Sequence, residues 1–168
     1  MNRNNNQAGF TLVEIVVGIG MITIFIGANF SYYKQVLSVS QQTTRHIQSG
    51  FLLEEGVEAI KLLRDESWSN NIATLTNGTK YYLQWNGTKW ATSTTAQLIE
   101  NTFTRYFTVS AVSRDNTGGV ATLDNIVSSG GVLDAGTKKI VMIVTWPMKG
   151  GGTSTSSVEA YITNIFNN

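Results

Sequence analysis

The stretch GFTLVEIVVGIGMITIFIGANF, residues 9–30, decides the fold, because apolar side chains fill it almost without interruption. The 21 residues from Phe10 to Phe30 match the roughly 20 that a helix needs to cross the hydrocarbon core of a bilayer. A helix in the core of a globular protein would show a polar face, and residues 15–25 show none. The stretch therefore predicts a membrane-spanning helix near the N-terminus.

An ordinary secretory signal is the first alternative for this stretch. Residues 1–9 are polar and carry the cation Arg3, which suits such a signal. However, no small-x-small cleavage site follows the apolar run, because Ser31-Tyr32-Tyr33-Lys34 comes next. The position of Arg3 before the span predicts that residues 1–9 lie in the cytoplasm and that the chain from about Lys34 lies outside the inner membrane.

An acid, Glu14, stands near the start of the apolar run. A carboxylate inside an apolar helix costs several kcal/mol unless it is paired or reaches the interface. One interpretation is that Glu14 lies near the headgroups. The other is that it has a dedicated cationic partner. No cation lies within the apolar run, so such a partner would come from another molecule.

Gly9-Phe10-Thr11-Leu12-Val13-Glu14, followed by an apolar helix, resembles the class III signal of type IV prepilins and pseudopilins. The resemblance implies that a membrane prepilin peptidase cuts between Gly9 and Phe10 and that the new amino terminus is methylated. It also implies that Glu14 pairs with the amino terminus of a neighbouring subunit in a filament. A charge pair in a low dielectric is costly to separate, so it could set the axial register. The implied partners are other pilin subunits, the peptidase and methylase, an inner-membrane assembly platform and the bilayer.

From Lys34 onward the helix is predicted to continue in amphipathic form and to end near Glu66. Apolar residues recur along one stripe, namely Ile47, Leu52, Gly56, Ala59 and Leu63, beside Leu53, Val57 and Ile60. The charged residues lie mostly off this stripe and predict a solvated face. The predicted organisation is a leader peptide at 1–9, a transmembrane and filament-core half at 10–33, an amphipathic half at 34–67 and a β-rich region at 68–168.

Beyond the helix, apolar residues recur at every second position, which is typical of β-strands. Residues 80–85, Asn86-Gly87 and residues 88–92 predict a β-hairpin with a two-residue loop that pairs Leu83 with Trp90. Alternation from Phe103 to Ala111 predicts another strand. Residues 140–146 are apolar on both faces and predict a central strand, and residues 158–162 predict a closing strand.

The predicted fold class is therefore α+β. The resemblance implies the type IV pilin fold, in which the long N-terminal helix packs on a C-terminal antiparallel β-sheet. We expect Trp68 and Trp146 to be core residues. Residues 55–60 with Arg64-Asp65, and residues 137–139 before 144–146, are also similar to a pattern in minor pilins and I-type pseudopilins.

The composition limits the kinds of binding and catalytic site that the chain can form. The chain has no cysteine and one histidine, His46, which exclude a thiolate metal site and argue against a histidine-based metal site or triad. The net charge of +1 implies no nucleic-acid partner. Some pseudopilins bind calcium, but the acids and amide available for a calcium loop lack the dense oxygen spacing of such a motif; they are Asp115, Asn116, Asp124 and Asp134. We expect no metal and no cofactor.

We expect a structural filament subunit, a minor pilin or pseudopilin, and no enzyme. No nucleophile with a base and an orienting group is evident in the sequence. One alternative is a tip-located adhesin or DNA-uptake pilin, which is compatible with assembly. The other is an extracytoplasmic domain on a signal anchor, unrelated to filaments. A generic anchor would need neither Glu14 nor the Gly9-Phe10 junction.

Overall fold

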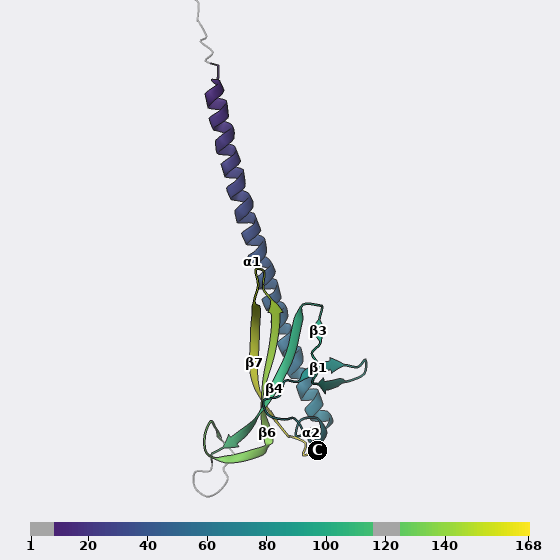
Figure 1. Cartoon of the computed structure of the whole chain (residues 1–168). Helices are drawn as coiled ribbons and strands as arrows, with labels where there is room; N and C mark the ends of the chain where they lie inside the picture. The colour runs from purple at the N-terminus through teal and green to yellow at the C-terminus, as the bar shows by residue number, and fades with distance from the viewer. Residues whose placement is uncertain (1–8, 116–124) are drawn as a thin grey trace, which may run out of the picture. The chain divides into compact units, whose positions relative to one another are not determined.

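The computed structural model describes residues 9–115 and 125–168 (Figure 1). By its internal contacts the chain divides into two compact units, Met1–Thr43 and Thr44–Asn168. One helix, α1 (Leu12–Glu66), contributes to both units and ends at Glu66, as predicted. No proline interrupts α1, because the one proline of the chain is Pro147.

The part of α1 in the first unit is apolar and exposed. Leu12 is 79% exposed and Phe25 is 71% exposed. Its polar side chains bond to the backbone one turn earlier. Thr23 Oγ1 donates to the Ile19 carbonyl at 2.8 Å, and Asn29 Nδ2 donates to the Phe25 carbonyl at 2.7 Å. Such bonds satisfy polar groups where water is absent, so this part of α1 suits a lipid environment.

The second unit adds a short helix and, within the described residues, seven strands. The helix is α2 (Trp68–Asn71). The strands are β1 (Tyr82–Trp85), β2 (Trp90–Ser93), β3 (Leu98–Ile99), β4 (Phe103–Arg114), β5 (Ile126–Val127), β6 (Val132–Pro147) and β7 (Thr153–Thr163).

The main sheet is antiparallel, with the order β3-β4-β6-β7 and with β5 paired to the end of β4. Strand β6 lies between β4 and β7, which confirms the central strand predicted at residues 140–146. Strands β1 and β2 form a separate hairpin. It joins the main sheet through Tyr81, whose N–H donates to the Phe107 carbonyl at 2.9 Å and whose carbonyl accepts from the Phe107 N–H at 2.8 Å.

The core lies between the sheet and the second part of α1, which confirms the α+β fold of a long helix packed on an antiparallel sheet. The helix contributes Leu53, Gly56, Ala59, Ile60 and Leu63. The sheet contributes fully buried side chains, among them Phe107, Ile140, Met142 and Val144. Trp68 and Trp146 are 5% and 4% exposed, so their predicted core role is confirmed.

The apolar stripe begins later than predicted. Ile47 is 56% exposed, whereas Ser49 is fully buried. They are two positions apart, which places them on different sides of the helix. Ser49 Oγ donates to the His46 carbonyl at 2.7 Å and lies 3.3 Å from Ser156 Oγ of β7. A small polar residue therefore occupies the position where the helix approaches the sheet edge.

The hairpin forms, but the predicted pairing of Leu83 with Trp90 is wrong. Leu83 pairs with Thr92, and Trp90 pairs with Trp85. Asn86 is not one of the two central residues of the turn but the residue before them. Its Oδ1 accepts from the backbone N–H groups of Thr88 and Lys89, at 3.0 and 2.9 Å. The two central residues are thus Gly87, with a φ of 94°, and Thr88. This shift moves each partner by two residues and keeps every side chain on its face.

The predicted alternation along β4 holds from Phe103 to Val109 and fails at Ala111. Ala111 is exposed and Val112 is 3% exposed. The register between β4 and β6 shifts between these two residues: Ala111 pairs with Lys138, and Val112 pairs with Asp134. Because β6 has extra residues in this bulge, the inward face of β4 moves to the neighbouring position.

Candidate processing and assembly site

Thr11 caps the first turn of α1. Its Oγ1 accepts from the Glu14 N–H at 3.3 Å. In return, Glu14 Oε2 accepts from the Thr11 N–H at 3.5 Å. This reciprocal arrangement is a capping box, which satisfies amide groups that have no partner at the start of a helix. The carboxylate of Glu14 also lies in the first turn, where the helix dipole stabilises a negative charge.

Sequence reasoning missed this local partner of Glu14. It considered only cations and expected the partner of the carboxylate to lie in another molecule. The signal was present as Thr11-Leu12-Val13-Glu14, a Thr followed three residues later by Glu just before an apolar run. The long contact of 3.5 Å leaves most of the hydrogen-bonding capacity of the carboxylate unused.

Gly9 and Phe10 precede α1, and both are exposed. Phe10 is 80% exposed. A Cβ atom added to Gly9 would meet no atom within 4 Å. Nothing in the described fold therefore requires glycine at position 9. A requirement for a small residue there would have to come from a protein that binds this junction.

The helix that follows is long and apolar enough to cross a membrane by length and composition. Its apolar side chains have no partner within the described part of the first unit, since Val13, Ile15 and Ile22 are each at least half exposed. Exposure of so many large apolar side chains marks a surface for lipid or for other helices.

A buried arginine in the second unit was not singled out by the sequence. The Arg105 side chain is 3% exposed, and its Nη1 lies 2.6 Å from Glu55 Oε2. The same Nη1 donates to the Leu52 carbonyl at 3.0 Å, whereas the buried Nε has no partner among the described atoms. This ion pair links β4 to α1.

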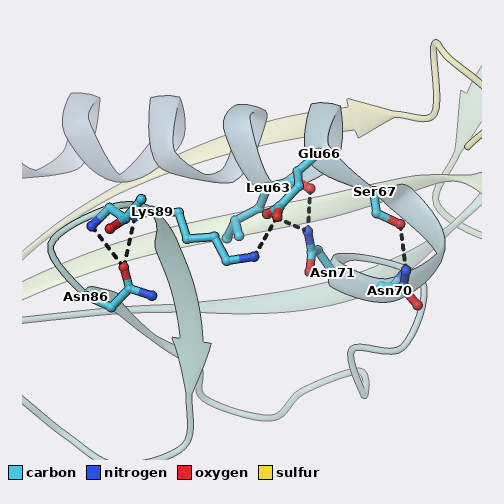
Figure 2. A network of polar contacts seen from close by, with 8 residues as sticks. Leu63, Glu66, Ser67, Asn70, Asn71, Asn86 and Lys89 are labelled. Carbon is cyan, nitrogen blue, oxygen red and sulfur yellow. Dashed lines mark hydrogen bonds and ion pairs between the residues drawn. The ribbon is translucent and has the colours of Figure 1, made fainter.

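A polar network closes the end of α1 (Figure 2). Lys89 Nζ of the hairpin lies 2.6 Å from Glu66 Oε1, and Asn71 Nδ2 donates to Glu66 Oε2 at 3.3 Å. The hydrogen bond from Lys89, only partly opposed by burial, holds the pKa of Glu66 below its ordinary value. Asn71 also donates to the Leu63 carbonyl at 2.9 Å, so it caps the last turn of α1.

The residues considered for calcium are Asp115, Asn116, Asp124 and Asp134. Asn116 and Asp124 lie outside the described residues. Asp134 is occupied otherwise: its Oδ2 lies 2.6 Å from Arg114 Nε, and its Oδ1 accepts from the Gly136 N–H at 2.9 Å. Within residues 9–115 and 125–168, no three histidine, aspartate or glutamate side chains gather as ligands of a metal ion would.

The fold and the head of α1 have the features of a type IV pilin-like prepilin. They combine an exposed apolar helix with the Gly9-Phe10 junction, Glu14 in its first turn and an antiparallel sheet packed on the second part of the same helix. Residues 4–28 match the family model described as the prokaryotic N-terminal methylation motif. No curated protein and no solved structure matches the chain. The signal and the apolar helix indicate membrane anchoring, processing by prepilin peptidase and assembly with other pilins.

Proposed function

We propose that this chain is a structural subunit, a minor pilin or pseudopilin, of a type IV pilus or a type II secretion-like filament. It acts by assembly and carries out no chemistry of its own. The N-terminal methylation motif at residues 4–28 carries the proposal, because it covers the Gly9-Phe10 junction and the first part of a helix with an exposed apolar surface. A subunit with this helix can exchange lipid for the helices of neighbouring subunits without exposing apolar surface to water.

The minor or pseudopilin role rests on a narrower resemblance. Residues 55–60 resemble a pattern in minor pilins and I-type pseudopilins, and in the structure this segment carries Glu55, Gly56, Ala59 and Ile60 at the interface with the sheet. The pattern therefore coincides with residues that hold the helix to the sheet.

The proposed location follows from the order of the segments. Residues 1–9 lie in the cytoplasm, α1 anchors the subunit in the inner membrane, and the unit Thr44–Asn168 lies outside it. After assembly the subunit belongs to an extracytoplasmic filament or to the cell surface.

The first test is the mature N-terminus. We expect the protein isolated from membranes or sheared filaments to begin at Phe10, with a methylated amine, when intact mass and N-terminal peptides are measured by mass spectrometry. A Gly9→Leu variant should fold normally, because the described fold does not require glycine at position 9. It should accumulate with its leader attached, because the peptidase requires a small residue there. A wild-type chain that starts at Met1, or one that starts beyond Ser31, would overturn the proposal.

A further inference from the structure

One tryptophan of the second unit stands out from the other three by its exposure. Trp68 and Trp146 are 5% and 4% exposed, and Trp90 is half-buried, whereas Trp85 is 54% exposed. Trp85 and Trp90 are cross-strand partners in the pair next to the hairpin turn. Their rings contact edge to face, with centroids 5.5 Å apart and planes at 62°. A large indole left in solvent costs hydrophobic free energy, so its position at the rim of a hollow needs an explanation.

The hollow beside Trp85 has a volume of ≈ 270 Å³. It lies between the end of α1 and the hairpin and is lined by Leu62, Leu63, Glu66, Trp85, Thr88, Lys89 and Trp90. Its lining is mostly apolar, with a carboxylate, an ammonium and a hydroxyl among the polar groups. This combination of apolar wall and few polar groups is typical of small-molecule sites, and the volume lies just below their usual range of about 300–1,000 Å³.

Two polar groups of the hollow, Glu66 and Lys89, are joined to each other and to neighbouring elements by hydrogen bonds (Figure 2). Asn71 and Lys89 converge on Glu66 from α2 and from the hairpin. Asn86 fixes the turn that carries Lys89 through two hydrogen bonds to the backbone. A preformed arrangement of this kind lowers the entropy lost on binding.

The charges of the hollow argue against an ion as the ligand. Lys89 and Glu66 are 2.6 Å apart and cancel each other, so a bound anion or cation would have to break this pair. Both groups have spare capacity for neutral partners. The ammonium has three donors, of which Glu66 uses one, and a carboxylate can accept about four hydrogen bonds, of which two are used.

We propose that this hollow, which we call the Trp85 hollow, binds a neutral saccharide, with a single sugar ring stacked on the Trp85 indole. The apolar face of a sugar ring covers the exposed indole, and its hydroxyl groups donate to Glu66 and accept from Lys89 without separating the two. All the residues belong to Thr44–Asn168, so the inference stands independently of filament assembly.

The test uses the full-length chain in a detergent without a sugar headgroup. Tryptophan fluorescence and saturation-transfer NMR report binding of maltose, lactose, chitobiose and mannobiose, with a single-stranded oligonucleotide as a further arm. We expect at least one disaccharide to bind with a millimolar Kd and the Trp85→Ala variant to weaken it by at least about tenfold. The matched control is Tyr161→Ala, which removes another half-exposed aromatic ring, from β7, and leaves the affinity unchanged.

A second variant, Glu66→Ala, should also lower the affinity while the stability of the fold is checked by thermal unfolding. Four outcomes would overturn the inference. None of the four disaccharides binds; Trp85→Ala binds the sugar as wild type does; Tyr161→Ala loses binding to the same extent; or the oligonucleotide binds and the sugars do not.

Discussion

At the scale of single residues, Arg105 shows how a charge is kept in the core. Its side chain is 3% exposed, whereas that of its partner Glu55 is 50% exposed. Removal of either residue therefore has a different consequence for the charge that remains. Without Arg105, the carboxylate turns to water. Without Glu55, the guanidinium stays buried with the Leu52 carbonyl and the face of the Trp90 ring, 5.4 Å from its centre, and without a counter-charge.

We predict that Glu55→Gln destabilises the protein more than Arg105→Met does. The first change weakens a charged hydrogen bond to a buried group and should cost about 1–3 kcal/mol. The second replaces a buried cation by an apolar chain of similar length and should change the stability by less than about 1 kcal/mol. Urea unfolding of the detergent-solubilised chain, followed by tryptophan fluorescence, gives both values. A larger loss for Arg105→Met would show that the ion pair itself stabilises the fold.

Single residues also show the limit of sequence reasoning. Gly9, Phe10 and Glu14 are recognisable because their motif is contiguous, and the same contiguity could have revealed the capping box. Arg105 gives no such signal, since it occupies an inward position of a strand pattern. Its partner Glu55 is 50 positions away along the chain. Only the register of the helix against the sheet brings them together.

At the scale of elements, the long strands and the central place of residues 140–146 were predictable, and local register was not. The apolar faces of residues 103–109 and 140–146 determine which strands face the core, and these predictions are confirmed. The hairpin turn depends on whether Asn86 enters the turn or caps it with its side chain, and both fit the same apolar pattern. The bulge after Ala111 depends on extra residues in β6 next to Asp134 and Gly136, a turn signal that the sequence analysis did not use.

This bulge carries a pH-dependent contribution to stability. The side chains of Arg114 and Asp134 are 17% and 15% exposed, and their atoms lie 2.6 Å apart. Burial opposes the ionisation of Asp134, but hydrogen bonds from Arg114, Thr137 and the Gly136 amide outweigh it and hold the pKa of Asp134 below its ordinary value. A lowered pKa in the folded state means that the unfolded chain binds this proton more readily.

We therefore predict that Asp134→Asn is destabilised at pH 7 and that its difference from wild type shrinks in acid. The contribution of Asp134 is complete above the unfolded pKa of roughly 3.9 and is lost as the pH falls through the lower folded pKa. Thermal unfolding of both proteins between about pH 6 and pH 2.5 measures the difference. A difference that stays constant over this range would mean that Asp134 acts through its shape and hydrogen bonds alone.

At the scale of the whole molecule, the two units differ in how their apolar side chains are covered. The unit Thr44–Asn168 has a hydrophobic core of its own. The first unit keeps its apolar side chains exposed, so its stability depends on lipid or on other subunits. Glu14 stands at the head of this exposed helix, where it serves the capping box and remains available to a partner.

The two roles of Glu14 can be separated by variants of the capping box. Glu14→Gln keeps a side chain that can close the box but removes the charge. Thr11→Ala keeps the charge but removes the Oγ1 acceptor, at a cost to the helix start of about 1 kcal/mol. Both variants should be cleaved and inserted into the membrane, because the Gly9-Phe10 junction and the apolar helix are intact.

We predict that Glu14→Gln enters filaments poorly, whereas Thr11→Ala enters them nearly as well as wild type. In the filament the carboxylate would meet the amino group of Phe10 from a neighbouring subunit, and loss of one partner of a buried charge pair costs roughly 3–5 kcal/mol. Apolar contacts along the helix still favour assembly, so some Glu14→Gln subunits should be admitted to mixed filaments. The measurement is the amount of each variant in sheared filaments at matched membrane levels. If Thr11→Ala were excluded and Glu14→Gln admitted, the helix cap would govern assembly; if both entered equally, Glu14 would set no register.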